Sequence, residues 1–281
     1  MILDSLIRIV EEKPSLRGRM YLRTLLKEAL QDYVLEFVYN HREYKKLLFT
    51  GGTCLRKIYG LPRLSEDLDF DYTDQFSIET FNEEVINYFA KKFQYRDIES
   101  KISRNQQTVY LKFPVLDQLG LVHNRADSTV LFLRCDFSSE KYSIFSTEIH
   151  SLSTKDFSFF VISYNLATLF ANKIVAFIER EYYRGGQQTI PFKGRDIFDL
   201  VWFLERNKKS SLQPNWERLQ VALQTEDKSE IVRQVISRLE GIHPKQVRED
   251  LSAFIESTST LEDFVNYYPD LIAQGMKCLV D

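Results

Sequence analysis

The sequence predicts an α+β protein in which a mixed half of strands and helices precedes a helical half. Segments rich in β-branched and aromatic residues, bounded by turn-like residues, lie before residue 164. From residue 165 almost to the end, apolar residues recur at helical spacing. We therefore expect two domains, 1–160 and 161–281, and a length of 281 residues is typical of a two-domain protein.

In the mixed half, helices are predicted where apolar residues recur with the helical period, and strands where short β-rich runs are bounded by turns. The longest helix has no internal glycine or proline. The expected helices are 19–39, 53–58 and 78–93, and the expected strands are 47–49, 67–71, 107–113, 129–137 and 157–163.

In the helical half, apolar stripes predict a series of helices, the second of which opens with Arg195-Asp196 just after Gly194. An exposed loop is expected at 184–191, where two glycines and a proline interrupt the pattern. The expected helices are 166–178, 195–204, 216–224, 229–239, 244–255 and 261–268.

Composition excludes several classes of protein. The net charge of −3 argues against binding of nucleic acid through the overall field, which leaves local basic patches. Three widely spaced cysteines match neither a closed disulfide framework nor a zinc motif. No apolar run of about 18 residues appears, and charge interrupts the N-terminus too early for a signal peptide. We therefore expect a cytoplasmic protein without a membrane partner.

The most informative segment couples a glycine turn, Gly51-Gly52, to alternating aspartates shortly downstream. Backbone N–H groups at such a turn, where a helix starts, can hold a phosphate. Period two places Asp67, Asp69 and Asp71 on one face of a strand, and a divalent cation usually neutralises like charges crowded in this way. Carboxylate oxygens favour Mg²⁺ or Mn²⁺ over zinc. The spacing alone also fits an ordinary strand-to-helix turn and a solvated strand edge.

Three further residues are candidates, each with a plain structural alternative. Asp136, on a neighbouring strand, would add the carboxylate of a two-cation site, but a structural aspartate at a strand end is equally expected. Lys173 is either a functional cation or a lysine whose ammonium reaches water from an apolar helix. Asp196 either belongs to the site or caps a helix, and Asp199 on the same face could pair with Arg195.

Four motifs occur in order between residues 49 and 205: Gly51-Gly52-Thr53, Leu64-Ser65-Glu66-Asp67-Leu68-Asp69-Phe70, Asn172-Lys173-Ile174-Val175-Ala176 and Arg195-Asp196-Ile197-Phe198-Asp199-Leu200. Together they resemble the AbiEii/AbiGii toxin family of nucleotidyltransferases. The resemblance implies a DNA polymerase β-like nucleotidyltransferase core, a helical C-terminal part, and the toxin role in a bacterial toxin–antitoxin or phage-defence pair.

Residue by residue, the resemblance also implies roles in the site. Thr53 stands where the family often has serine, and a hydroxyl is kept. Asp136 has no equally sharp motif around it, so its assignment as metal ligand and catalytic residue rests on its strand alone. The implied phosphate-binding residues are Gly51, Gly52, Thr53, Ser65 and Lys173, the implied metal ligands are Asp67 and Asp69, and Asp196 is implied to complete the catalytic site.

These observations together predict transfer of a nucleoside monophosphate from an NTP to an acceptor hydroxyl, with Mg²⁺ or Mn²⁺ and release of pyrophosphate. The resemblance implies a tRNA 3′ end as the acceptor and a cognate antitoxin as a partner. One alternative is transfer to a small molecule or to a protein hydroxyl, because the core chemistry does not fix the acceptor. The other is a catalytically silent nucleotide-binding module, against which the set of acids and Lys173 argues.

Overall fold

The computed structural model describes residues 2–16, 20–180, 182–184, 188–190 and 192–280. Contacts divide the chain into two compact units. Unit 1 consists of Met1–Glu140 and Glu148–Ser163, and unit 2 consists of Lys141–Thr147 and Tyr164–Asp281. Among the described helices, none is long and apolar enough to cross a membrane.

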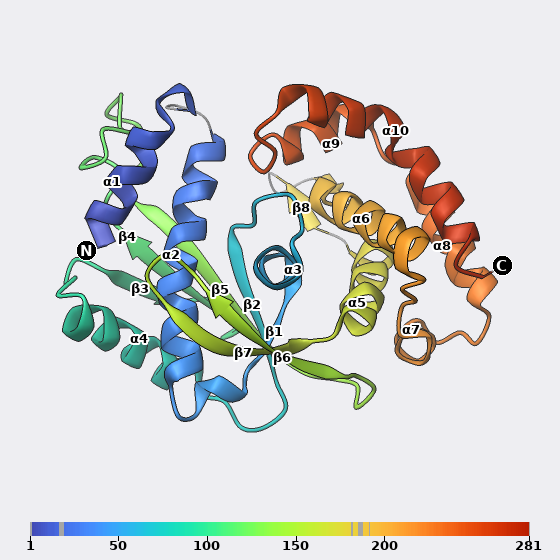
Figure 1. The fold of residues 1–281 in the computed structure, drawn as a ribbon, viewed down its shortest axis with the longest axis horizontal. Coiled ribbons are helices and arrows are strands. Elements are labelled where there is room, and N and C mark those ends of the chain that lie inside the picture. Colours follow the sequence, from blue (N-terminus) through green and yellow to red (C-terminus); the bar gives the residue numbers. More distant parts are fainter. Residues whose placement is uncertain (1, 17–19, 181, 185–187, 191, 281) are drawn as a thin grey trace. The chain divides into compact units, whose positions relative to one another are not determined.

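Unit 1 is built on a mixed sheet with the strand order β3-β4-β5-β2-β1-β7-β6 (Figure 1). The middle strand, β2, pairs antiparallel with β1 and parallel with β5. Antiparallel pairing continues from β5 to β4 and β3, and β1 pairs parallel with β7. The strands are β1 (Leu48–Thr50), β2 (Asp67–Tyr72), β3 (Glu99–Ile102), β4 (Thr108–Phe113), β5 (Leu131–Ser139), β6 (Thr147–Ser153) and β7 (Ser158–Tyr164).

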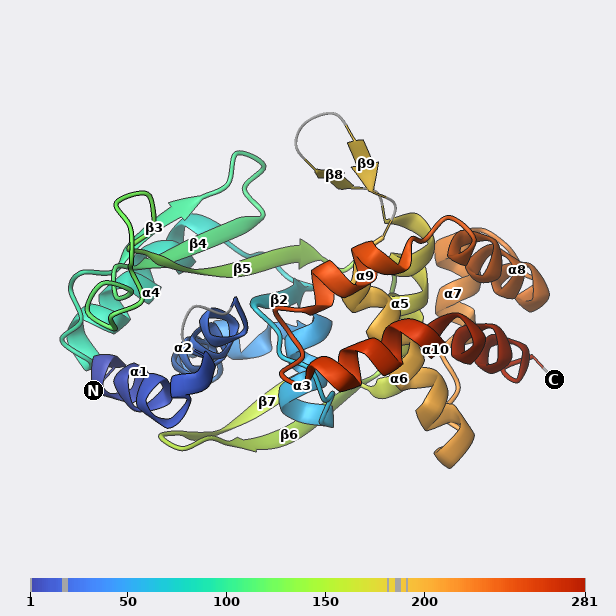
Figure 2. The ribbon, with the colours of Figure 1, turned by 90° about the horizontal axis from the view of Figure 1, so that it is seen from above.

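Four α-helices of unit 1 are described. Ser77 caps α4 by accepting a hydrogen bond from the Thr80 N–H at 3.2 Å, and Gly60 ends α3 in the left-handed conformation at φ +76°. Helices α2 and α4 lie against one face of the sheet (Figures 1 and 2). The helices are α1 (Ile2–Glu12), α2 (Met20–Asn40), α3 (Gly51–Tyr59) and α4 (Ile78–Lys92).

Alternation along β2 and β5 gives the sheet two different faces. Leu68, Phe70, Cys135 and Phe137 are at most 2% exposed, and the ring of Phe81 from α4 contacts Phe137 with centroids 4.7 Å apart. The residues between them point the other way, and the aspartates of β2 are only half-buried. This agrees with the predicted period of two. We call the second face, which carries Asp67, Asp69 and Asp136, the acid face.

Unit 2 is a cluster of helices around α5 and α6. Phe170 of α5 stacks on Phe203 of α6 with centroids 4.6 Å apart. Helix α10 approaches α6 closely, because a Cβ at Gly275 would lie 2.8 Å from the Cβ of Leu204. The elements are α5 (Leu166–Glu179), β8 (Tyr182–Arg184), β9 (Gln188–Ile190), α6 (Gly194–Ser210), α7 (Trp216–Leu223), α8 (Lys228–Leu239), α9 (Pro244–Leu251) and α10 (Thr258–Lys277).

The structure corrects the sequence prediction at several elements. The loop expected at 184–191 is wrong for Arg184 and for Gln188–Ile190, because Gln188–Ile190 pairs antiparallel with Tyr182–Arg184. Residues 185–187 and 191 lie outside the described residues. Helix α10 continues through Pro269 instead of ending at Tyr268, because Ile272 and Met276 extend the same buried stripe. Helix α9 is shorter than predicted. No prediction covers α1, β3 or β6.

Candidate active site

The glycine turn places the start of α3 directly against the acid face. Gly51 adopts φ +75°, a left-handed conformation that favours glycine. A Cβ at this position would lie 2.0 Å from Oδ2 of Asp69, so a larger side chain would collide with the carboxylate. Backbone conformation and space therefore both require glycine at residue 51. Because glycine has no side chain, the Asp69 carboxylate can lie beside the N-terminus of α3.

The second glycine lies against a buried arginine that sequence reasoning missed. A Cβ at Gly52 would be 2.7 Å from Nη2 of Arg63 and 3.1 Å from Oγ of Ser65. Arg63 is only 3% exposed, and its Nη1 donates a hydrogen bond to the Leu64 carbonyl at 2.8 Å. The signal in the sequence was a cation two residues before Ser65. Arg63 adds positive charge at the turn, where the helix N-terminus already favours an anion.

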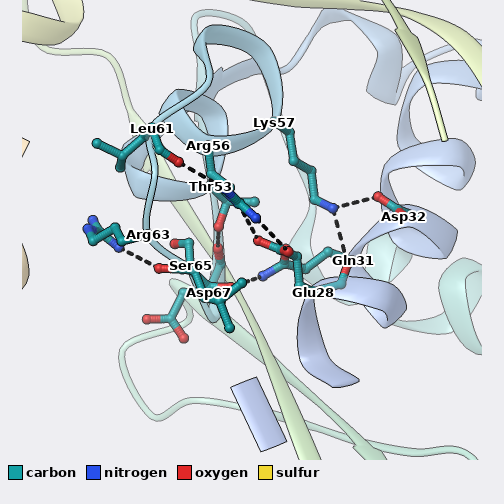
Figure 3. Close-up of polar contacts among 11 residues, drawn as sticks. Glu28, Gln31, Asp32, Thr53, Arg56, Lys57, Leu61, Arg63, Ser65 and Asp67 are labelled. Atoms are coloured by element: carbon teal, nitrogen blue, oxygen red, sulfur yellow. Dashed lines mark hydrogen bonds and ion pairs between the residues drawn. The ribbon is translucent and has the colours of Figure 1, made fainter. Parts of the chain in front are cut away.

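Thr53 connects α3 to the first residue of β2. Its side chain is fully buried, and its hydroxyl donates a hydrogen bond to the Asp67 carbonyl oxygen (Figure 3). In the structure this hydroxyl therefore serves the backbone of β2. The contact fixes the strand that carries the aspartates relative to the glycine turn.

Helix α2 holds the segment between α3 and β2 in place. The fully buried Gln31 donates a hydrogen bond from Nε2 to the Ser65 carbonyl at 2.8 Å (Figure 3). Lys27 pairs with Glu66 at 2.8 Å. Lys57 of α3 pairs with Asp32 of α2 at 2.6 Å. Burial raises the pKa of Asp32, although the charge of Lys57 and its hydrogen bond act in the opposite direction.

The parallel pairing of β2 with β5 brings the carboxylates together. Asp69 is the register partner of Asp136, and Asp67 is the register partner of Arg134. Register partners on adjacent strands have their side chains on the same face, with Cβ atoms about 5 Å apart. We call Asp67, Asp69 and Asp136 the acid cluster.

Two neighbours hold the Asp136 carboxylate. Arg134 Nε lies 2.8 Å from its Oδ2, and the Thr108 hydroxyl donates to its Oδ1 at 2.5 Å. Burial alone would lower the pKa of Arg134, but the charge of Asp136 and the hydrogen bond to it, with the charge of Asp67, raise it. Burial also raises the pKa of the Cys135 thiol well above its usual value, and all three charges of the acid cluster add to this shift.

The donor chemistry of the acid cluster suits a hard divalent cation. Its ligand atoms would be carboxylate oxygens, which Mg²⁺ and Mn²⁺ prefer. In the side-chain positions of the structure, no group of three or more His, Cys, Asp or Glu in the described ranges is arranged to hold a metal ion. The positive charge next to Asp136 in the structure is that of the Arg134 guanidinium.

Unit 2 contains a separate group of charged side chains between α5 and α6. Lys173 Nζ lies 2.7 Å from Oδ2 of Asp199 and 3.9 Å from Oδ1 of Asp196. Arg180 Nε lies 2.8 Å from Oδ2 of Asp196. Asp196 and Asp199 are 4% and 0% exposed. We call these four residues the α5–α6 charge cluster.

The α5–α6 charge cluster bears on the alternatives left open by the sequence. The side chain of Lys173 is 12% exposed and its ammonium faces two carboxylates, so it is not a lysine that extends into water. The N-cap residue of α6, Lys193, makes no side-chain cap hydrogen bond, and the Asp196 carboxylate lies against Arg180. The partnership of Lys173 with Asp199 was missed, because nothing in the sequence indicates how two helices pack.

The predicted site residues thus fall into two groups. Within unit 1 the structure brings together Gly51, Gly52, Thr53, Ser65, Asp67, Asp69 and Asp136. Within unit 2 it brings together Lys173 and Asp196.

Comparison with solved structures shows that this chain shares its fold with a nucleotidyltransferase toxin at low sequence identity. MenT4, a nucleotidyltransferase toxin of Mycobacterium tuberculosis H37Rv, is 15% identical, with a TM-score of 0.55 over 97% of this chain and 92% of that chain. JHP933 from Helicobacter pylori is 16% identical, with a TM-score of 0.49 over 92% of this chain and 93% of that chain. A putative nucleotidyltransferase from H. pylori is 17% identical, with a TM-score of 0.44 over 92% and 96%.

A search of curated proteins finds no significant match. The family model described as "Nucleotidyl transferase AbiEii toxin, Type IV TA system" matches residues 37–269, which is most of the chain. The matched range includes the glycine turn, the acid cluster and the α5–α6 charge cluster. The chain therefore belongs to the AbiEii family of nucleotidyltransferase toxins from type IV toxin–antitoxin systems.

Proposed function

We propose that this toxin transfers a nucleoside monophosphate from an NTP to a hydroxyl group at the 3′ end of an RNA, with tRNA as the acceptor and Mg²⁺ or Mn²⁺ as the cofactor. The observation that carries the proposal is the position of Asp69, which lies against the N-terminus of α3 on one side and beside Asp136 on the other. A phosphate held at the glycine turn would therefore adjoin the carboxylates.

The nucleotide phosphates would bind at Gly51 and Gly52, where backbone N–H groups and the helix dipole favour an anion. Arg63, buried beside Gly52, would add charge-assisted hydrogen bonds. The Ser65 hydroxyl borders the same glycine and would contact a phosphate oxygen. Thr53 would act indirectly on phosphate binding, because its hydroxyl holds Asp67, the first residue of β2, in position.

The acid cluster would hold the metal ions, which neutralise phosphate charge and lower the pKa of the attacking hydroxyl. Asp69 would be central, since it is the acid that adjoins both the glycine turn and Asp136. The Asp136 carboxylate would accept the proton of the acceptor hydroxyl, and Asp196 is the alternative proton acceptor. Arg134, 2.8 Å from its Oδ2, would hold the Asp136 carboxylate in position for this role.

Lys173 is proposed to contact the nucleotide phosphates and Asp196 to complete the catalytic site, as the family resemblance implies. The ion pair with Asp199 would hold the Lys173 side chain in one orientation. Asp199 would then be a positioning residue for the lysine. A cognate antitoxin is the expected partner of a toxin of this family.

The proposal can be tested by incubating the protein with bulk tRNA, Mg²⁺ and each labelled NTP in turn. We expect label on RNA, loss of label with EDTA, and loss of label in the Asp69→Asn variant. Asp71→Asn is a matched control, because Asp71 lies one pleat further along β2, opposite Ser138 instead of Asp136.

The fractions in which label appears separate the proposal from its alternatives. Label in the protein or small-molecule fraction, and none on RNA, would replace the RNA acceptor by another hydroxyl. NTP binding without transfer to any acceptor would indicate a silent module. Equal labelling by Asp69→Asn and Asp71→Asn would contradict the proposed role of the acid cluster.

A further inference from the structure

The acid face carries an exposed aromatic side chain near the start of β5. Phe132 is 44% exposed. It pairs with Lys112 of β4 and lies two residues before Arg134, the partner of the first residue of β2, so β4 flanks it and β2 does not. It lies two and four residues from Arg134 and Asp136, and therefore on the same face. Its distance from Asp136 along the strand is about 13 Å. An exposed ring on a sheet face can stack against the planar base of a ligand.

The residues next to Phe132 on this face are mostly cationic or aromatic. Lys112 of β4 is the register partner of Phe132, and Tyr110 is the partner of Arg134. Lys101 of β3 is in turn the partner of Tyr110, and it is exposed. Lys112 Nζ pairs with Glu99 at 3.3 Å. We call Phe132, Tyr110, Arg134, Lys112 and Lys101 the β3–β5 strip.

The direction of the reaction determines which substrate meets the β3–β5 strip. In the proposed chemistry the leaving pyrophosphate belongs to the NTP bound at Gly51-Gly52, which follows β1 on one side of β2. Attacking and leaving oxygens lie roughly in line in phosphoryl transfer. The acceptor hydroxyl must then approach from the opposite side of β2, which is the side of β5 and β4.

From this placement we infer that the β3–β5 strip binds the last unpaired nucleotides of the RNA acceptor. Bases of single-stranded RNA stack on exposed aromatic side chains of a sheet, and Phe132 offers such a ring beside Tyr110. Lysines beside the stacked bases neutralise phosphates, which Lys101 and Lys112 would do here. The inference rests on the proposed transfer to RNA and extends it by naming the residues that receive the acceptor.

The inference can be tested by measuring RNA binding separately from catalysis. The probe is a fluorescent 12-nucleotide single-stranded RNA with a free 3′ hydroxyl, and its Kd is measured by anisotropy without NTP. Phe132→Ala should weaken binding about tenfold, and Phe132→Trp should keep it, because stacking needs a ring and tolerates a larger one. Phe132→Leu should resemble Phe132→Ala, and since it keeps an apolar side chain it controls for loss of folding.

The matched control is Phe160→Ala. Phe160 is 70% exposed on β7 of the same sheet, three strands away from β5 on the far side of β2 and β1. It should leave the RNA affinity unchanged. Lys101→Gln provides a second measurement: it should reduce the slope of log Kd against log salt by roughly 0.7, the value for one phosphate of a single strand.

The transfer assay distinguishes failure of this inference from failure of the proposed function. Phe132→Ala should raise the KM for RNA and leave the KM for NTP unchanged. If the protein labels RNA but Phe132→Ala and Phe160→Ala bind it equally well, the inference is overturned and the function stands. A raised KM for NTP alone would assign Phe132 to the nucleotide base instead and overturn the inference. If the parent protein neither binds nor labels RNA, the proposed acceptor fails and the inference fails with it.

Discussion

Unit 1 and unit 2 each contain a cluster of charged side chains, but the two clusters are built in opposite ways. The acid cluster places three carboxylates at neighbouring positions of two strands, so that charges of the same sign crowd together. The α5–α6 charge cluster places Lys173 of α5 and Arg180, the residue after its end, against two carboxylates of α6. Its carboxylates are almost completely buried, whereas the aspartates of β2 are half-buried.

The difference indicates which cluster is made for a ligand. Crowded carboxylates that face partly into solvent gain most when a cation or a charged substrate arrives. Buried and opposite charges already satisfy one another, and removal of one partner leaves the other uncompensated. A substitution in the acid cluster should therefore affect activity more than stability, and a substitution in the α5–α6 charge cluster should affect stability first.

The largest effect is expected for Asp69→Asn. Asparagine keeps the shape that fits beside Gly51 but removes the charge, so transfer should fall about a thousandfold. The free energy of unfolding should change by less than about 1 kcal/mol. Initial rates of label transfer and urea unfolding curves measure the two quantities. A stability loss comparable with the activity loss would contradict the division between the clusters.

The second effect is expected for Asp199→Asn, which leaves the Lys173 ammonium without its nearest carboxylate, at 2.7 Å. Breaking a buried pair in this way should lower the free energy of unfolding by about 3 kcal/mol. Urea unfolding measures it. Glu249→Gln is the matched control, since its partner Lys245 and Glu249 itself are 72% and 49% exposed, and it should cost less than about 1 kcal/mol.

The prediction for Asp199 affects how activity data on Lys173 should be interpreted. If Asp199→Asn unfolds as easily as Lys173→Ala, lost transfer in Lys173→Ala follows from lost structure as well as from lost phosphate binding. The double variant Lys173→Met with Asp199→Leu separates the two, because it removes both charges. It should regain stability and remain inactive.

A smaller effect is expected for Gly51→Ala, and the chain offers an internal control. Gly51 and Gly60 have nearly the same φ, +75° and +76°, at the two ends of α3. Alanine at Gly60 meets no atom within 4 Å and should cost about 1 kcal/mol for backbone strain alone.

Alanine at Gly51 must in addition displace the Asp69 carboxylate, so the cost should reach about 2 kcal/mol or more, with loss of transfer. The comparison of the two variants by urea unfolding and label transfer isolates the contact with Asp69. Equal effects of the two substitutions would show that Asp69 moves freely away from the glycine turn.

The sequence predicts the core of both units well because local periodicity follows burial. The alternation of Asp67, Leu68, Asp69 and Phe70 is reproduced in the exposure of their side chains. Strands β3 and β6 lie at the two edges of the sheet, and their polar composition gives no apolar run to detect. Helix α1 was predictable, because its buried Ile2, Leu6 and Val10 recur at helical spacing, but the prediction did not use this stripe.

For the candidate site, the sequence identified the residues that lie close together along the chain but not the contacts between distant segments. The spacing of the glycine turn and the aspartates identified the components of the unit 1 site. It could not show that Gly51 contacts Asp69, or that Arg63 is buried at Gly52, because both depend on how α3 packs on β2. The pairing of Lys173 with Asp199 likewise depends on the packing of α5 on α6.

The last prediction concerns the rate at which a thiol reagent modifies each of the three cysteines. Two of them lie in unit 1 and one in unit 2, so they report on the two units separately. Cys54 and Cys135 are buried in unit 1, and Cys278 at the end of α10 is exposed. Burial and then the charges of the acid cluster raise the pKa of Cys135, so that it stays a thiol at pH 8, whereas the reactive species is the thiolate. We expect a thiol reagent to modify Cys278 rapidly in the folded protein, and the other two only as the sheet opens.

Raising the pH distinguishes protection by structure from protection by charge. Between pH 8 and pH 9.5 the exposed Cys278 should be modified, while the buried Cys54 and Cys135 stay unmodified. In Cys278→Ser the rapid phase should disappear, and urea should then release the remaining two thiols with the unfolding of unit 1. Rapid modification of Cys135 without urea would mean that β5 detaches from β2 in the native state, and the acid cluster would then have no fixed geometry.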